Sequence, residues 1–159
     1  MEFFFVTNRE SETITLGNNI GKLLQSGDVV ALVGDLGSGK TCLVRGICNG
    51  LNCVDDISSP TFTIINEYQG KYPVFHFDFY RIESDQEIFD LGYEEYFYDS
   101  GVCLVEWADR ALAFLPRERI EVYLTGIFEP GKENSREIKL ILKGEKIKHR
   151  PWSRLINQA

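Results

Sequence analysis

The segment GDLGSGKT, residues 34–41, has the residue types and spacing of a phosphate-binding loop. It matches the pattern G-x-x-x-x-G-K-[ST] at every fixed position. Gly37 and Gly39 can adopt positive φ, which lets successive backbone N–H groups surround phosphate oxygens. Lys40 supplies positive charge, and Thr41 supplies a hydroxyl for Mg²⁺. The predicted nucleotide contacts are Asp35, Leu36, Gly37, Ser38, Gly39, Lys40, Thr41 and Cys42.

Two carboxylates could complete such a site, because a phosphate loop needs an acid beyond a strand to hold Mg²⁺ or to orient a water molecule. Glu106 follows the unbroken apolar run VCLV and is predicted as the metal-side acid, together with Thr41. Asp78 follows VFHF, a run that a histidine interrupts, and is predicted to lie near the metal or the attacking water. Two ordinary roles stay open. Asp78 could pair with Arg81, and Glu106 could cap the helix that follows it.

The segment SSPTFTI, residues 58–64, lies between the predicted phosphate-loop helix and the next predicted strand. GTPases place at this point a switch segment that contacts the γ-phosphate and Mg²⁺. Thr61 follows Pro60, whose ring stiffens the approach, and could have this switch role or simply begin a strand. The predicted catalytic residues are Lys40, Thr61, Asp78 and Glu106.

The sequence favours adenine as the base of the bound nucleotide. Guanine-specific GTPases use N-K-x-D, and neither that motif nor D-x-x-G occurs in the chain. The loop is not a dinucleotide fingerprint, since G-x-G-x-x-G beginning at Gly37 fails at Cys42. ATP is therefore the expected nucleotide. Trp107, beside Glu106, could be a packing aromatic or a platform on the nucleotide side.

The patterns around these residues predict an α/β fold. Val29–Val33 has the apolar character of a buried strand, and residues 40–51 have a helical pattern. Capping boxes at 7–10 and 84–87 predict a helix to about Gln25 and a second, short helix. The other predicted elements are strands at Phe3–Val6, within 62–68 and 72–80 (an antiparallel hairpin), at 102–106, Arg119–Thr125 and Arg136–Leu142, and a helix at Ala108–Leu115. This order predicts a three-layer sandwich of the P-loop NTPase type, with a mixed parallel and antiparallel central sheet.

Composition indicates one domain, residues 1–142, followed by a basic tail. The 159 residues are 43% hydrophobic, enough for one well-filled core. A net charge of −7 disfavours a free-standing nucleic-acid binder, because phosphate neutralisation needs surplus positive charge. Residues 143–159 reverse the sign, with five basic residues and one acid. Four cysteines without a C-x-x-C pair disfavour a zinc site, and no segment has a membrane-span or signal-peptide pattern, so a cytoplasmic protein is expected.

A family resemblance emerges when the motifs are taken in order. GDLGSGKT, SPTFTIINEY, HFDFYRI, LGYEEYF and VCLVEWADRALAFLP resemble the motif set of TsaE (also called YjeE), over roughly residues 10–125. TsaE is the small bacterial P-loop ATPase needed to make threonylcarbamoyladenosine in tRNA. The resemblance implies a mixed sheet flanked by helices, Mg²⁺-dependent ATP hydrolysis, and work with TsaB and TsaD. In that family TsaD transfers the threonylcarbamoyl group, and tRNA is expected to be contacted through the complex.

The resemblance also implies roles for single residues. Lys40 and Thr41 match the phosphate and Mg²⁺ positions, and Thr61 matches the switch-like threonine. Asp78 matches the acid of the H-x-D motif, and Glu106 with the adjacent tryptophan matches the E-W motif. Two positions depart from the family pattern: Ser38 stands where alanine is usual, and Cys42 where a second threonine is common. The second departure puts a thiol beside the nucleotide and leaves sensitivity to oxidation open.

Three functions stay open at this level. The leading one is an ATPase subunit that hydrolyses slowly alone and acts through its partners. A small-molecule kinase would need an acceptor pocket and several arginines, for which Arg45 and Arg81 are the plausible residues. A nucleotide-gated binding module would hydrolyse ATP only incidentally. The basic tail could touch tRNA or an acidic partner surface, or could be a solvated and partly disordered end.

Overall fold

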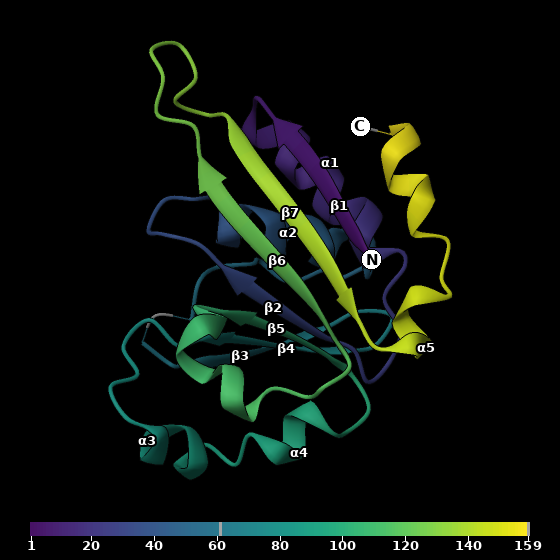
Figure 1. Cartoon of the computed structure of the whole chain (residues 1–159). Helices are drawn as coiled ribbons and strands as arrows, with labels where there is room; N and C mark the ends of the chain where they lie inside the picture. Colours follow the sequence, from purple (N-terminus) through teal and green to yellow (C-terminus); the bar gives the residue numbers. More distant parts are fainter. Residues whose placement is uncertain (61, 159) are drawn as a thin grey trace.

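A mixed sheet runs through the centre of the structure, a computed structural model that describes residues 1–60 and 62–158 (Figure 1). In this part of the chain the sheet has seven strands in the order β1-β7-β6-β2-β5-β4-β3. They are β1 (Glu2–Thr7), β2 (Val29–Val33), β3 (Ile65–Gln69), β4 (Pro73–Asp78), β5 (Val102–Glu106), β6 (Arg119–Gly126) and β7 (Arg136–Lys143). β2 lies parallel to both β5 and β6, and β4 lies parallel to β5, whereas β1, β3 and β7 pair antiparallel. The predicted mixed sheet is confirmed.

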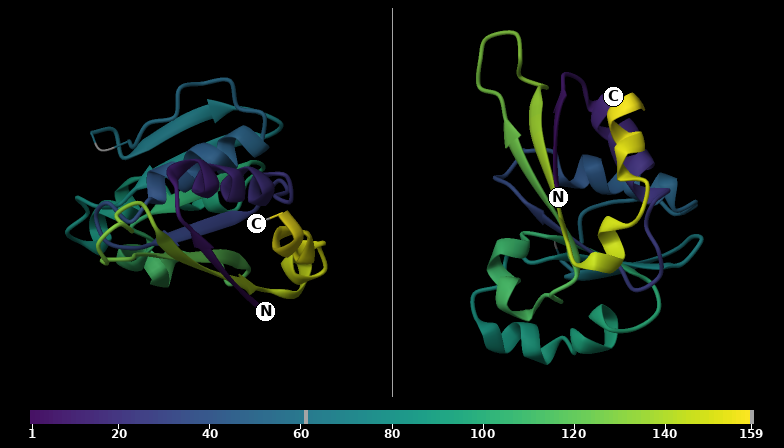
Figure 2. Two further views of the ribbon diagram at one scale, coloured as in Figure 1. Left: turned by 90° about the horizontal axis from the view of Figure 1, so that it is seen from above. Right: turned by 45° about the vertical axis from the view of Figure 1, so that its right-hand side comes forward.

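Helices cover both faces of this sheet. They are α1 (Glu10–Gly21), α2 (Lys40–Gly50), α3 (Asp85–Asp90), α4 (Glu94–Phe97), α5 (Glu145–Lys148) and the 3₁₀ helices η1 (Ala108–Phe114) and η2 (Trp152–Gln158). On β2, Val30 and Leu32 pack with α1, α2 and the C-terminal segment, whereas Val29 and Ala31 pack with α3, α4 and η1 (Figures 1 and 2). A strand buried on both faces has a continuous apolar sequence, as β2 does. The three-layer prediction is therefore confirmed.

The first helix begins later than its sequence pattern predicts. β1 continues to Thr7, which pairs with Arg136 of β7, so Thr7 cannot be the N-cap. Arg9 takes that place, and α1 runs from Glu10 to Gly21 instead of reaching Gln25. The Thr7 hydroxyl instead shares a hydrogen bond of 2.7 Å with the Thr13 hydroxyl. The second predicted capping box, Ser84 with Glu87 at the start of α3, is present.

α1 and α2 approach each other through glycines, and this contact sets the position of the phosphate-loop helix. A Cβ added at Gly46 of α2 would lie 2.2 Å from the Ile14 carbonyl oxygen of α1. A Cβ at Gly17 of α1 would lie 2.5 Å from the Leu43 carbonyl oxygen of α2. Only glycine fits such a close approach of two backbones. This contact therefore fixes the position of α2 relative to α1.

The basic C-terminal segment is folded onto the body of the protein, with η2 beside α1 (Figures 1 and 2). Ile147, Trp152 and Leu155 are buried in the same cluster as α1 and α2. The Trp152 indole N–H donates to the Ile147 carbonyl oxygen at 2.6 Å. Arg150 forms a bidentate ion pair with Asp28, with Nη2 and Oδ1 2.8 Å apart. Residues 145–157 are therefore an ordered part of the fold and not a solvated end.

Trp152→Ala is expected to lower the free energy of unfolding by about 3–5 kcal/mol, because it removes a fully buried indole and leaves a cavity. Urea denaturation followed by circular dichroism measures this change. The matched control is Ile156→Ala in the same 3₁₀ helix, where the side chain is 60% exposed. A surface substitution of this kind changes stability by less than about 0.5 kcal/mol. Equal effects of the two substitutions would show that the segment is not docked.

No helix in the described ranges 1–60 and 62–158 has both the length and the apolar character needed to cross a membrane.

Candidate functional site

The phosphate loop connects the end of β2 to the start of α2. Gly37 and Gly39 adopt φ of 76° and 101°, in the left-handed region that favours glycine. At Gly34 an added Cβ would lie 2.5 Å from the Ser38 hydroxyl and 2.6 Å from the Leu124 carbonyl oxygen. Backbone N–H groups and the positive end of α2 therefore meet at one concave point, which is an arrangement that binds phosphate.

Lys40, the first residue of α2, reaches back across the mouth of this loop. Its ammonium group donates to the carbonyl oxygens of Gly34 at 2.6 Å and Asp35 at 2.9 Å, and lies 4.1 Å from the centroid of the Trp107 ring. Burial lowers the pKa of Lys40, and the nearby carboxylates Glu106 and Asp78 partly offset this effect. A poorly solvated cation is thus held where the phosphates of a ligand would come closest.

The two predicted acids lie side by side at the carboxyl ends of adjacent parallel strands. Asp78 ends β4 and Glu106 ends β5, and the two residues are direct neighbours in the register of the sheet. Glu106 Oε1 accepts a hydrogen bond of 2.8 Å from the Thr41 hydroxyl. A hydroxyl and a carboxylate oxygen converging at the start of α2 are the hard oxygen ligands that Mg²⁺ prefers. The site chemistry therefore fits a magnesium ion held by Thr41 and Glu106.

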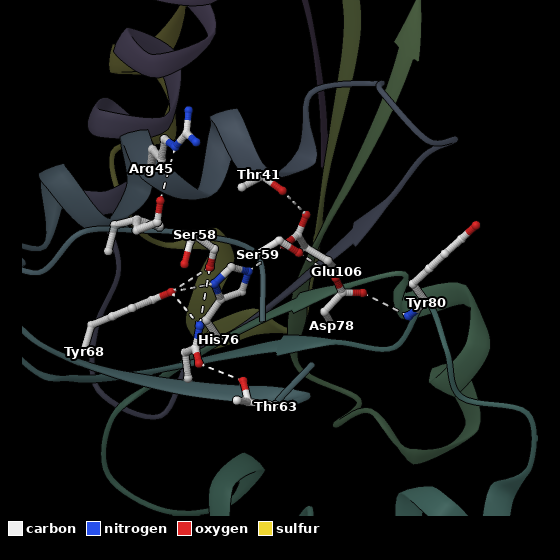
Figure 3. A network of polar contacts seen from close by, with 12 residues as sticks. Thr41, Arg45, Ser58, Ser59, Thr63, Tyr68, His76, Asp78, Tyr80 and Glu106 are labelled. Carbon is white, nitrogen blue, oxygen red and sulfur yellow. Dashed lines mark hydrogen bonds and ion pairs between the residues drawn. The ribbon is translucent and has the colours of Figure 1, made fainter. Parts of the chain in front are cut away.

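Asp78 is bound by the segment that leads into β3, and not by Arg81. Its carboxylate accepts hydrogen bonds from the Ser59 hydroxyl at 2.6 Å and from the Tyr80 backbone N–H at 2.9 Å (Figure 3). The Arg81 guanidinium carbon lies instead 4.9 Å from the centroid of the Phe62 ring. The alternative ion pair between Asp78 and Arg81 is absent from the described contacts. Thr61, the predicted switch residue, lies outside the described residues.

A buried polar network supports Glu106, the predicted metal-side acid, on the side away from Thr41 (Figure 3). His76 is fully buried in β4, and its Nε2 lies 2.6 Å from Glu106 Oε2. The other ring nitrogen, Nδ1, lies 3.1 Å from the Tyr68 hydroxyl, which donates to the Ser58 carbonyl oxygen at 3.0 Å. The sequence analysis treated His76 as an interruption of an apolar strand and as part of the H-x-D motif, and predicted no role for it. A polar residue in a strand buried on both faces was the available signal.

Trp107 belongs to the site and not only to the packing between sheet and helices. It follows Glu106 in the left-handed conformation, with φ of 57°, which is uncommon for a residue with a bulky side chain. This conformation turns the ring into the cleft, where it lies over Lys40 and 4.9 Å from the centroid of the Tyr80 ring. The sequence left open whether Trp107 packs in the core or faces a nucleotide, and the ring lines the cleft.

A cleft of about 480 Å³ joins these groups. It extends from the carboxylates past the phosphate loop to the first turn of α1 and the loop before β7. Its lining residues are Glu10, Thr13, Leu36, Gly37, Gly39, Lys40, Thr41, Cys42, Ser59, Asp78, Tyr80, Glu106, Trp107, Asn134 and Arg136. Burial and the nearby Glu10 raise the pKa of the Cys42 thiol. Because the thiolate is the reactive form, this environment disfavours oxidation of Cys42.

Arg136 is a site residue that sequence reasoning missed. It begins β7, far from the loop in sequence, yet its Nη2 donates to the Gly37 carbonyl oxygen at 3.2 Å. Its Nη1 donates to the Ser135 carbonyl oxygen at 2.9 Å. Of the two arginines expected near the site, Arg45 forms an ion pair with Glu10 and Arg81 stacks on an aromatic ring. No local pattern marks Arg136, because its proximity depends on the pairing of β6 with β7.

Arg136→Gln is expected to weaken binding of a nucleoside triphosphate by about tenfold, because a charged hydrogen-bond donor contributes about 1.5–3 kcal/mol. Titration calorimetry with ATP measures this change. Lys139→Gln is the matched control, since Lys139 is a cation of the same strand that pairs with Glu2 outside the cleft. Equal affinities of the Arg136 variant and this control would exclude a role of Arg136 in the cleft.

Comparison with known proteins identifies the family. The family model described as "Threonylcarbamoyl adenosine biosynthesis protein TsaE" matches residues 7–138. The chain belongs to the TsaE family. The matched range contains the phosphate loop, both carboxylates, His76 and Arg136. The family membership predicted from the motifs is therefore confirmed.

Individual relatives cover most of the chain. The tRNA threonylcarbamoyladenosine biosynthesis protein TsaE of Treponema pallidum is 38% identical over 128 residues, covering 80% of this chain and 95% of that protein. The protein of the same description from Bacillus subtilis is 40% identical over 141 residues, covering 88% of this chain and 85% of that protein. The crystal structure of Bacillus subtilis YdiB superposes with a TM-score of 0.79 at 32% identity, over 99% of this chain and 95% of that one.

Proposed function

We propose that the chain is a Mg²⁺-dependent ATPase subunit that supports threonylcarbamoyl transfer to adenosine in the anticodon loop of tRNA. The observation that carries the proposal is the convergence of Lys40, Thr41 and Glu106 at the phosphate loop, with Asp78 beside them. A phosphate cradle alone would suit any phosphorylated ligand. The added pair of carboxylate and hydroxyl oxygens supports a nucleotide that carries a metal ion.

Each of these residues has a distinct role in the proposed reaction. Lys40 would exchange its loop carbonyl partners for oxygens of the β- and γ-phosphates. Thr41 and Glu106 would hold Mg²⁺, which when bound neutralises charge developing on the phosphates. Asp78 lies next to Glu106 at the same edge of the sheet and would orient the attacking water. Trp107 covers Lys40 and limits the access of bulk water to the ammonium group.

The proposed partners are TsaD and TsaB, with tRNA contacted indirectly through the complex. The names of the relatives support a role in tRNA threonylcarbamoyladenosine biosynthesis. The net charge of −7 supports indirect contact, since an acidic protein binds a polyanion poorly by itself. Slow hydrolysis alone and faster hydrolysis in the complex are expected under this proposal, in a cytoplasmic setting.

Reconstitution with TsaB, TsaD, tRNA and an activated threonylcarbamoyl donor tests the proposal. With ATP we expect multiple rounds of threonylcarbamoyladenosine formation, and with a non-hydrolysable ATP analogue at most one round per complex. Equal yields with both nucleotides would contradict the ATPase and favour a nucleotide-gated binding module. Appearance of a phosphorylated small molecule in place of free phosphate would favour a kinase. Matched reactions without this chain supply the baseline.

A further inference from the structure

An unbroken chain of hydrogen bonds, buried at His76 and part-buried at Ser58, connects the metal-side acid to the backbone of the segment before β3 (Figure 3). It runs from Glu106 Oε2 to His76 Nε2 over 2.6 Å, and from His76 Nδ1 to the Tyr68 hydroxyl over 3.1 Å. It ends at the Ser58 carbonyl oxygen, 3.0 Å from that hydroxyl. Glu106 and His76 are almost completely buried, so water does not replace the two contacts of His76 at low cost.

At the Ser58 end of this chain the direction of the hydrogen bond follows from the atoms involved. A carbonyl oxygen only accepts, so the single proton of the Tyr68 hydroxyl is donated to Ser58. The direction of the hydrogen bond between the Tyr68 hydroxyl and His76 Nδ1 follows the tautomer of the imidazole, and the Asn66 amide also donates to this hydroxyl at 3.4 Å. His76 Nε2 and Glu106 Oε2 share a hydrogen bond of 2.6 Å. Both ring nitrogens of His76 and the Tyr68 hydroxyl therefore have hydrogen-bond partners.

This arrangement fixes which oxygen of Glu106 faces the cleft. Oε2 is held by His76, so Oε1 is the oxygen that contacts the Thr41 hydroxyl. Without the His76 contact the Glu106 carboxylate could rotate, and Oε1 would no longer point toward the Thr41 hydroxyl. Metal-binding sites commonly depend on such outer partners, which orient the residues that contact the ion.

We propose that His76 and Tyr68 are positioning residues that hold Glu106 Oε1 toward the magnesium position and couple it to the backbone at Ser58. The inference rests on the proposed function, because it assumes that Glu106 serves a metal-bound nucleotide. Neither side chain lines the cleft. Both act through Glu106.

Hydrogen bonds from other parts of the site hold all three residues of the segment 57–59, so the whole segment is coupled to Glu106. Arg45 of α2 donates to the Ile57 carbonyl oxygen at 3.3 Å, Tyr68 donates to Ser58, and the Ser59 hydroxyl donates to Asp78 at 2.6 Å. Both carboxylates of the site therefore share one supporting segment. Any movement of this segment on nucleotide binding would change the orientation of Glu106 through Tyr68 and His76.

The test measures ATP affinity by titration calorimetry, once with excess Mg²⁺ and once with a chelator. His76→Leu removes both ring nitrogens and is expected to reduce the gain in affinity that Mg²⁺ gives by about tenfold, within the usual range for partners of metal ligands. His76→Gln keeps an amide donor near the Nε2 position and should recover most of that gain. Affinity without Mg²⁺ should stay at the wild-type value in both variants. His149→Gln is the matched control, because His149 is the other histidine and is exposed.

Tyr68→Phe removes only the hydroxyl and keeps the ring, so it separates positioning from packing. We expect a smaller loss of the Mg²⁺-dependent gain, with the exposed Tyr98→Phe as control. Because Tyr68 acts through His76, the double variant Tyr68→Phe/His76→Leu should lose no more than His76→Leu alone.

Three outcomes decide between the ideas. A wild-type protein whose ATP affinity does not depend on Mg²⁺ would overturn the proposed function and this inference together. A Mg²⁺-dependent wild type with unchanged His76 and Tyr68 variants would overturn the inference alone. Equal losses of ATP affinity with and without Mg²⁺, or additive losses in the double variant, would assign both residues a merely structural role. Either result would also overturn the inference.

Discussion

Lys40→Met is expected to lower ATP affinity by about a hundredfold, since an ammonium that contacts phosphate contributes about 1.5–3 kcal/mol and 1.4 kcal/mol corresponds to a factor of ten. Met keeps the length and the apolar stem of the side chain and removes only the charge. The fold should tolerate this change, because burial already opposes ionisation of Lys40, as its lowered pKa indicates. Removing an amine that is held by two loop carbonyls should therefore cost little stability.

Two measurements check this result on the same protein. Titration calorimetry gives ATP affinity, and urea denaturation gives the free energy of unfolding. Lys71→Met is the control, because Lys71 is an exposed lysine in the β3–β4 turn, outside the cleft. ATP binding by Lys40→Met at the affinity of the control would contradict the assignment of the phosphate site. Unfolding of the variant would instead mean that the amine supports the loop itself.

Glu106→Gln is expected to lower the rate of ATP hydrolysis by about a thousandfold, in the range observed when a group that stabilises transition-state charge is removed. The amide has nearly the same shape as the carboxylate, so the contacts to Thr41 and His76 keep their geometry while the negative charge is lost. Affinity for ATP in the absence of Mg²⁺ should rise or stay unchanged, because a carboxylate repels phosphate. The steady-state hydrolysis rate in the proposed complex with TsaB and TsaD measures the main effect.

The matched control for this variant is Glu121→Gln on β6. Glu121 is as buried as Glu106, at 2% exposure, but contacts Arg119, Tyr123 and Lys143 and lies outside the cleft. Loss of a buried carboxylate as such should therefore affect both variants in stability, whereas only Glu106→Gln should lose hydrolysis. Hydrolysis at the wild-type rate in Glu106→Gln would refute a role of this acid in the reaction. Equal loss in both variants would point to stability as the cause.

The two neighbouring carboxylates, Asp78 and Glu106, form a site that is prepared to bind a cation. Asp78 and Glu106 are held close together by adjacent parallel strands, and each is compensated by a different neighbour. Glu106 contacts Thr41 and His76, and Asp78 contacts Ser59 and the Tyr80 backbone N–H. Because two neighbouring carboxylates repel each other when both are charged, a cation between them would be stabilised.

The sequence by itself determined the local elements of the site. The phosphate loop depends on glycines at fixed positions between one strand and one helix, and all of these residues are neighbours in the chain. The buried strands Val29–Val33 and Val102–Glu106 were predictable because a strand covered on both faces must be apolar throughout. Family membership was also predictable, because the motifs are contiguous. The roles of the site residues, ATP, Mg²⁺ and the partners remain predictions, as does the role of Thr61.

Only the tertiary structure decided which distant residues meet at the loop. The order β2-β5-β4 puts Asp78 beside Glu106, and the pairing of β6 with β7 brings Arg136 to Gly37. The sequence predicted both acids at the site, but their direct pairing and the place of Arg136 depend on strand order and register, which arise from the packing of all layers together. The same holds for the contact of Tyr68 with His76 across β3 and β4, and for the C-terminal segment. Trp152 and Arg150 lie in a segment whose basic composition is typical of a solvated tail. In the structure Trp152 is buried in the core, and Arg150 pairs with the buried carboxylate of Asp28.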